Sequence, residues 1–99
     1  MIIVAGTIRV PADRLAEARP VLTRMVEATR VEPGCLTYSF AEDLLDPGLI
    51  RVFEIYIDAA ARQAHSASAH MKAFREAWPA LGIGDRQISD YEISAAPEN

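Results

Sequence analysis

The chain has 99 residues, a net charge of −4, an apolar fraction of 51% and one cysteine. This length suits one domain, and the interspersed acidic and basic residues leave no basic patch of the kind that binds nucleic acid. No apolar run approaches the ~20 residues that a membrane helix needs, and Cys35 alone cannot form an intrachain disulfide. We therefore expect a single domain over residues 1–99 in the reducing cytoplasm, without nucleic-acid or membrane partners.

Residues 2–31 predict a strand followed by a helix. Residues 2–10 alternate β-branched apolar side chains with smaller or polar ones, as a strand does, and Pro11 ends the pattern. Residues 13–31 repeat apolar side chains at helical spacing. Pro20 falls inside this helix, where it removes a backbone hydrogen bond, so we expect a kink or a looser first turn.

Residues 32–41 predict a turn and a second strand. Pro and Gly in the turn at 32–34 end the helix. Residues 35–41 then alternate large and small side chains, which indicates a strand with one buried face. On this pattern Leu36, Tyr38 and Phe40 share one face of the strand, and Cys35, Thr37 and Ser39 share the other.

Residues 49–57 predict a third strand, which a hairpin connection over residues 42–48 joins to the second. This strand is apolar on both faces apart from Arg51 and Glu54. A strand that is apolar on both faces is covered on both faces, and the helices of so short a chain can cover only one. We therefore expect a second copy of the chain to cover the other face, giving a homodimer.

Residues 58–78 predict a helical region in two pieces, with a break near Ser68, a suitable N-cap for the second piece. Glycines at 82 and 84 end this region, residues 86–94 predict a last strand, and we expect residues 95–99 to fray. The order β-α-β-β-α-β predicts an α+β, ferredoxin-like fold, in which a four-stranded antiparallel sheet carries its helices on one face.

The two histidines of the chain, His65 and His70, fall in one short stretch. On one continuous helix a separation of five residues turns the side chain by about 140°, so the two would not share a face. A break between them could bring them together and place His70 in the first turn of a new helix, where a neutral imidazole can serve as a base. The alternative is that one histidine packs or caps and the other is exposed.

Other side chains could take part in such a site. If Glu54 faces the helices, it is a buried carboxylate or orients a histidine; otherwise it pairs with Arg51. Tyr38 could donate a hydrogen bond to a substrate oxygen, or it could belong to the core. Phe74 and Trp78, four residues apart on a helix, share a face and could stack on a flat aromatic ligand or pack in the core.

Two histidines and a glutamate are also possible metal ligands. Their spacing in the sequence is poor for that purpose, and no other strong ligand set lies near them, so we predict no metal site. The chain also has no motif that binds nicotinamide, flavin or haem, so we predict no cofactor.

Four short motifs follow one another along the chain: Glu32-Pro-Gly-Cys-Leu-x-Tyr38, the Asp46-Pro47 turn, Phe53-Glu54-x-Tyr56, and His65-x-x-Ser68-x-His70-x-x-x-Phe74. This ordered set resembles the antibiotic biosynthesis monooxygenase (ABM) family of dimeric α+β barrels. The resemblance covers almost the whole chain. It implies that two chains pair sheet to sheet, and that each holds a pocket between its own sheet and helices, lined by the third strand and the two-piece helix.

The resemblance favours a cofactor-independent monooxygenase that oxidises a quinol- or anthrone-like aromatic with O₂ to a quinone. One histidine would be the base, Glu54 would orient it, and Tyr38 would donate to the developing oxyanion. The candidate catalytic residues are His65, His70 and Glu54. The candidate substrate-binding residues are Tyr38, Phe53, Phe74 and Trp78.

Other functions on this fold stay open. An isomerase of a small phosphorylated sugar would need a basic group such as Arg51 or Lys72 in the pocket. A non-catalytic ligand-binding barrel would tolerate the loss of its histidines. Haem degradation is disfavoured, because the first strand lacks the Asn of the haem-degrading relatives. In addition, His65 stands near their Trp position, and Trp78 lies well beyond it.

Overall fold

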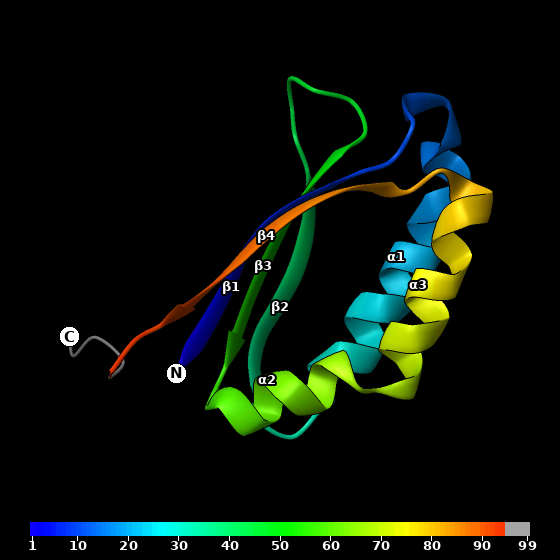
Figure 1. The fold of residues 1–99 in the computed structure, drawn as a ribbon. Coiled ribbons are helices and arrows are strands. Elements are labelled where there is room, and N and C mark those ends of the chain that lie inside the picture. The colour runs from blue at the N-terminus through cyan, green and yellow to red at the C-terminus, as the bar shows by residue number, and fades with distance from the viewer. Residues whose placement is uncertain (95–99) are drawn as a thin grey trace.

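Four strands form one antiparallel sheet in the computed structural model, which describes residues 1–94. The strands are β1 (Ile2–Arg9), β2 (Cys35–Glu42), β3 (Leu49–Tyr56) and β4 (Gly84–Glu92), in the spatial order β2-β3-β1-β4. The helices are α1 (Leu15–Arg30), α2 (Ala59–Ser66) and α3 (Ala69–Leu81), preceded by a short 3₁₀ turn at Ala12–Arg14. Figure 1 shows the helices on one side of the sheet, which confirms the predicted ferredoxin-like fold.

The core lies between this sheet and the helices. In β1 the alternation predicted from the sequence buries Val4 and Ile8, which are 0% and 2% exposed. A glycine is required between them, because a Cβ atom at Gly6 would lie 2.0 Å from the carbonyl oxygen of Gln87 in β4. Residue 6 therefore has no room for a side chain where β1 pairs with the edge strand β4.

The apolar stripe of α1 faces the sheet, as the sequence predicts. Its buried residues are Leu15, Ala18, Leu22, Met25 and Thr29. The first turn of the predicted helix is the 3₁₀ turn, and α1 then continues through Pro20 as one helix. Pro20 is exposed, so water can reach the backbone around it.

The prediction that Leu36 shares a face with Tyr38 and Phe40 is wrong. The pairing of β2 with β3 passes from Cys35 opposite Tyr56 to Thr37 opposite Ile55, which leaves Leu36 as the extra residue of a β-bulge. Leu36 is consequently 55% exposed, while Tyr38 is 3% exposed on the inner face. An extra residue reverses the alternation of side chains, and hydrophobicity alone does not reveal it.

The predicted break in the helical region is confirmed. α2 ends at Ser66, and the Ser68 hydroxyl caps α3 by accepting a hydrogen bond from the Met71 N–H at 3.2 Å. α3 continues beyond the predicted end to Leu81, because Gly82 in a left-handed conformation is the residue that ends it. The last strand begins at residue 84, and the predicted frayed tail, residues 95–99, lies outside the described residues.

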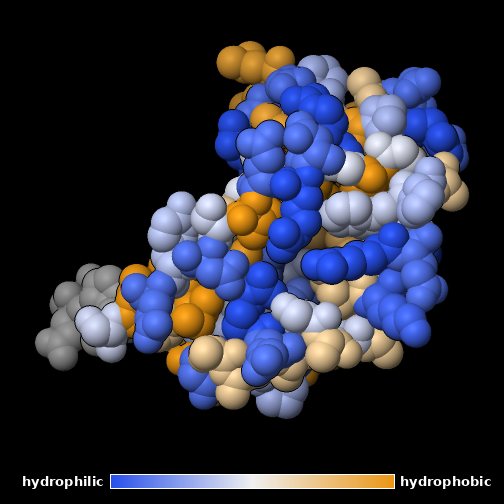
Figure 2. All heavy atoms as spheres, in the orientation of Figure 1, coloured by the Kyte–Doolittle hydropathy of each residue, from blue (hydrophilic) through white to orange (hydrophobic). Residues whose placement is uncertain are grey.

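The sheet face away from the helices carries apolar side chains that no element of the described chain covers. Ile3 pairs with Ile55 on one side and with Tyr91 on the other, and Ala5 pairs with Phe53. Phe53 is 42% exposed and Tyr91 55%. In Figure 2 apolar side chains gather at the lower left, over the strand ends where β1 begins and β4 finishes. Within residues 1–94, no helix is both long and apolar enough to cross a membrane.

Candidate functional site

Both histidines meet the carboxylate of Glu32. His65 lies in the last turn of α2 and His70 in the first turn of α3, so the break between the helices turns both rings toward the α1–β2 turn. His65 Nδ1 lies 3.0 Å from Glu32 Oε2, and His70 Nε2 contacts the same oxygen. The ring centroids are 6.0 Å apart. The expectation that a helix break would bring the histidines together is confirmed.

The three side chains run from the interior toward the surface. The His65 side chain is 2% exposed, Glu32 15% and His70 28%. The Ser68 hydroxyl fixes the geometry further by donating to the His65 carbonyl at 2.7 Å while it caps α3. Ser68 thus joins the end of α2 to the start of α3, which fixes the backbone positions from which the two imidazoles reach Glu32.

Glu54 lies behind His65, on the helix side of β3. The Tyr56 hydroxyl donates to Glu54 Oε1 at 2.6 Å, and His65 Nε2 is 3.9 Å from that oxygen. Arg51 instead pairs with Asp43. Burial raises the pKa of the Glu54 carboxyl above its ordinary value, although the hydrogen bond from Tyr56 and the nearby imidazole oppose this rise.

Two tyrosines flank His65. The rings of Tyr38 and Tyr56 each lie with their centroid 5.4 Å from that of His65. Burial raises the pKa of both phenols, and for Tyr56 the hydrogen bond to the Glu54 carboxylate adds to the rise. Both phenols therefore stay protonated, so neither is a base, and the Tyr56 hydroxyl donates to Glu54.

The predicted aromatic residues separate into two groups. Phe74 and Trp78 meet edge to face with centroids 5.6 Å apart, on the same side of the sheet as the histidines. Within residues 1–94, the Trp78 indole N–H is a buried donor that lacks a hydrogen-bond partner. Phe53 points to the opposite face of β3 from Glu54, because successive strand residues alternate, so it does not line a pocket with His65 in this chain.

The space between the sheet and the helices is small. A cavity of about 30 Å³ there is lined by several predicted site residues, among them Tyr38, Glu54, His65, Phe74 and Trp78. This volume accommodates about one or two water molecules. The pocket that the family resemblance implies is therefore present, but in this conformation it is nearly filled by side chains.

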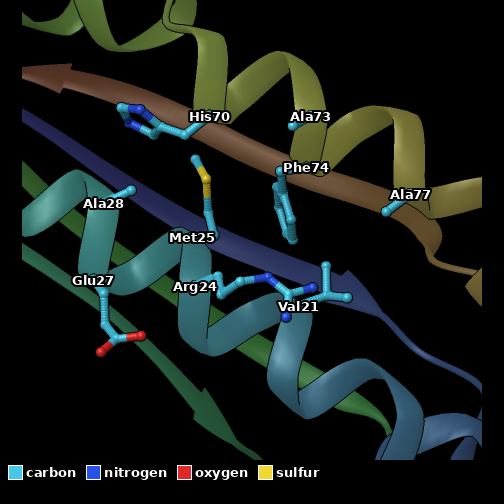
Figure 3. Close-up of a pocket in the computed structure, with 9 residues that line it drawn as sticks. All are labelled: Val21, Arg24, Met25, Glu27, Ala28, His70, Ala73, Phe74 and Ala77. Atoms are coloured by element: carbon cyan, nitrogen blue, oxygen red, sulfur yellow. The ribbon is translucent and has the colours of Figure 1, made fainter.

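A larger groove of about 650 Å³ runs between α1 and α3. Figure 3 shows Met25 of α1 and Phe74 of α3 pointing into it, with His70 one turn before Phe74. Val21 and small side chains of α3 complete the apolar part of the walls, Arg24 adds a guanidinium to the lining, and Glu27 points away. Ligand sites commonly enclose about 300–1,000 Å³, so this groove has a suitable size. Phe74 lines both the groove and the inner cavity.

Sequence reasoning treated Glu32 only as part of a turn and missed its place in the site. Its position before Pro33-Gly34 in the first of the four motifs was a signal, but only the folded chain shows that it contacts both histidines. The side chains of Glu32, His65 and His70 each offer a ligand atom, and these atoms all lie within 4.8 Å of one another. The cluster can thus hold a proton or a metal ion.

Comparison with known proteins identifies the family. The model of a family described as antibiotic biosynthesis monooxygenase matches residues 1–77. The chain belongs to the antibiotic biosynthesis monooxygenase family. The matched region of this ABM chain includes Glu32, Glu54, His65 and His70, whereas Trp78 and β4 fall beyond it.

Individual relatives agree with this assignment. A crystal structure of a candidate antibiotic biosynthesis monooxygenase from Deinococcus radiodurans is 32% identical, with a TM-score of 0.90 over 100% of this chain and 98% of that one. Rv0793 from Mycobacterium tuberculosis is 26% identical, with a TM-score of 0.77 over 98% of this chain and 96% of that one. The uncharacterized protein sll1783 of Synechocystis is 33% identical over 94% of this chain, which spans only 63% of that relative's length.

Proposed function

We propose that this ABM protein is a cofactor-independent monooxygenase that oxidises a quinol- or anthrone-like aromatic with O₂ to a quinone. The observation that carries the proposal is the position of His70. It is held by a carboxylate, it is 28% exposed, and it lies at a mainly apolar groove of about 650 Å³. A base fixed beside an apolar space is what the deprotonation of a flat phenolic substrate requires.

The tautomer of His70 follows from its contact with Glu32. A neutral imidazole whose Nε2–H donates to Glu32 keeps its lone pair on Nδ1. His70 Nδ1 is then the base that takes a proton from the substrate, and Glu32 stabilises the imidazolium that forms. Glu54 and Tyr56 act as positioning residues, since they lie against His65, and His65 contacts the same Glu32 oxygen as His70.

The substrate supplies all the electrons in this reaction. For an anthrone, the carbanion left by deprotonation passes one electron to O₂, and the resulting radical and superoxide combine to form a carbon–oxygen bond. The peroxide takes back the proton from His70, and the second C–H proton leaves as the O–O bond breaks. One oxygen atom remains as the new carbonyl and the other departs as water, so the methylene carbon has lost four electrons and O₂ has gained four.

The aromatic substrate lies against Phe74 and Met25 in the proposed complex. Because Phe74 also lines the inner cavity, rotation of its ring would join the two spaces and bring the substrate within reach of Tyr38 and Trp78. The buried indole N–H of Trp78 is then a donor available to a substrate oxygen.

Oxygen uptake tests the proposal. Metal-stripped wild type, His70→Ala and His65→Ala are assayed with a panel of quinols and anthrones, with Gln63→Ala as a matched control, since Gln63 is exposed on α2. We expect uptake above the autoxidation rate in wild type and control, and a decrease of about 10²–10⁴-fold in His70→Ala. Binding of the aromatics without turnover would instead identify a non-catalytic ligand-binding barrel.

We further propose that two chains pair through the sheet face that bears Ile3, Phe53 and Tyr91. Support comes from the apolar exposure of this face, since an uncovered apolar surface of this kind is typical of a protein–protein interface. Sedimentation at micromolar concentration should give twice the chain mass for wild type and for Lys72→Glu, a change on the helix side. Phe53→Glu should sediment as a monomer, and a monomeric wild type would refute the pairing.

A further inference from the structure

One oxygen of Glu32 is approached by a nitrogen from each histidine of the chain. We propose that Glu32, His65 and His70 form a binding site for one divalent transition-metal ion. The proposal does not depend on the oxidation reaction, and it contradicts the prediction from sequence spacing that the chain has no metal site. That prediction considered the two histidines and Glu54, whereas the fold supplies a different carboxylate, from a turn 33 residues before His65.

The distances suit an ion of this kind. The ligand atoms of the three side chains all lie within 4.8 Å of one another, and His65 Nδ1 is 3.0 Å from Glu32 Oε2. Tetrahedral coordination with bonds of about 2.0–2.1 Å places ligand atoms roughly 3.3 Å apart. Small side-chain rotations are therefore enough to place all three around one ion, and the backbone need not move.

The ligand set selects the class of metal. Two imidazoles and one carboxylate bind Zn²⁺ at catalytic zinc centres and Fe²⁺ in non-haem oxygenases, whereas Mg²⁺ and Ca²⁺ prefer sites made of oxygen atoms alone. Three protein ligands leave further coordination positions for water or a small ligand. His70, which is 28% exposed, provides the route by which an ion enters.

A second observation supports the site independently of the ligand distances. A metal on Nδ1 of His65 leaves the ring proton on Nε2, and this nitrogen faces Glu54 Oε1 at 3.9 Å. Glu54 is in turn held by the hydroxyl of Tyr56 at 2.6 Å. Metal-binding histidines usually direct their other ring nitrogen to a carboxylate in this way. The gap of 3.9 Å is closed by a small movement or by one bridging water.

Metal binding and the proposed base function exclude each other. A metal on Nε2 of His70 forces the ring proton onto Nδ1, which then has no lone pair to accept a substrate proton. Zn²⁺ at the site should therefore inhibit oxygen uptake by the metal-free route, and removal of the ion should restore it.

Titration with Co²⁺ tests the site, because Co²⁺ takes the same ligands as Zn²⁺ and its visible absorption reports coordination number. We expect one Co²⁺ per chain in metal-stripped wild type and in Gln63→Ala. In His70→Ala and Glu32→Gln the affinity should fall more than about 100-fold. His70→Ala is the decisive variant, because His70 is partly exposed and its loss leaves the core intact; circular dichroism verifies that the variant is folded.

Two results would overturn the metal site: no Co²⁺ absorption band from protein-bound ion, or equal affinity in wild type and His70→Ala. Equilibrium dialysis against Zn²⁺ provides the stoichiometry without any assay of activity. The two proposals are tested by separate measurements. Co²⁺ binding is measured without substrate and tests the metal site alone, whereas oxygen uptake is measured on metal-stripped protein and tests the proposed function alone.

Discussion

Replacement of Glu32 with Ala removes the acceptor that the two imidazoles share. His65 is 2% exposed, so its Nδ1–H loses its hydrogen-bond partner and cannot reach water. A buried donor left without a partner costs about 1–3 kcal/mol of unfolding free energy. His70 is 28% exposed and can turn to solvent, so its lost contact adds at most about 1 kcal/mol. The two terms together give about 1–4 kcal/mol, and we expect a loss near the middle of this range, about 2–3 kcal/mol.

For a domain of 60–100 residues each kcal/mol lowers Tm by about 4–8 °C, so Glu32→Ala should melt roughly 10–20 °C below wild type. Glu32→Gln keeps an oxygen that accepts one N–H, and we expect it to lose about half as much unfolding free energy as Glu32→Ala. Urea unfolding in the presence of a chelator measures the loss of unfolding free energy in both variants, and a thermal melt measures the change in Tm. Both are followed through the fluorescence of Trp78, the one tryptophan of the chain.

Glu27→Ala is the matched control, since Glu27 is exposed on α1 and should change the unfolding free energy by less than about 0.5 kcal/mol. All variants are compared at one protein concentration, so that any association contributes equally. If Glu32→Ala were as stable as the control, the shared carboxylate would not hold the buried imidazole, and the reasoning for the whole cluster would fail.

Three further predictions concern the scaffold of the site. Ser68→Ala removes the α3 cap and should lower the unfolding free energy by about 1 kcal/mol, which appears as a lower Tm in a thermal melt. Oxygen uptake should also fall, because the start of α3 positions His70. An unchanged Tm would contradict the capping role. The pKa of the Glu54 carboxyl is raised in the folded state above its ordinary value of 4.5. The protonated carboxyl therefore contributes fully to stability below pH 4.5, and this contribution is lost as the pH rises through the folded-state pKa. The unfolding free energy of Glu54→Gln relative to wild type should thus increase between pH 4 and 8, and a constant difference in urea titrations would refute the raised pKa. Gly6→Ala brings a Cβ atom 2.0 Å from a β4 carbonyl and should destabilise by about 1–3 kcal/mol or more in the same titration, whereas a neutral effect would show that β1 and β4 can separate freely.

Local patterns in the sequence were sufficient for the order of elements. The alternation in residues 2–10 and the apolar stripe of α1 each depend on neighbours within a few positions, and both are found where predicted. The break at Ser68 was predictable for the same reason, since capping is a contact between a side chain and a backbone N–H three residues away. Because that break is local, the approach of His65 and His70 could also be anticipated.

The bulge at Leu36 marks where local patterns fail. Its position depends on how β2 registers against β3, which is a property of two strands together. For β3 the local alternation already places Phe53 and Glu54 on opposite faces, and only the packing of the helices on the sheet decided that Glu54 faces the histidines.

The sequence by itself thus determined which segments are strands and helices, where the helical region breaks, and which family motifs the chain carries. Only the tertiary structure decided that Glu32, rather than Glu54, directly contacts both imidazoles, and that a groove between α1 and α3 opens beside His70. The physical reason is distance along the chain. Propensity, capping and periodicity act over a few residues, whereas the cluster joins a turn after α1 to side chains 33 and 38 residues later, and packing of the helices on the sheet sets that contact.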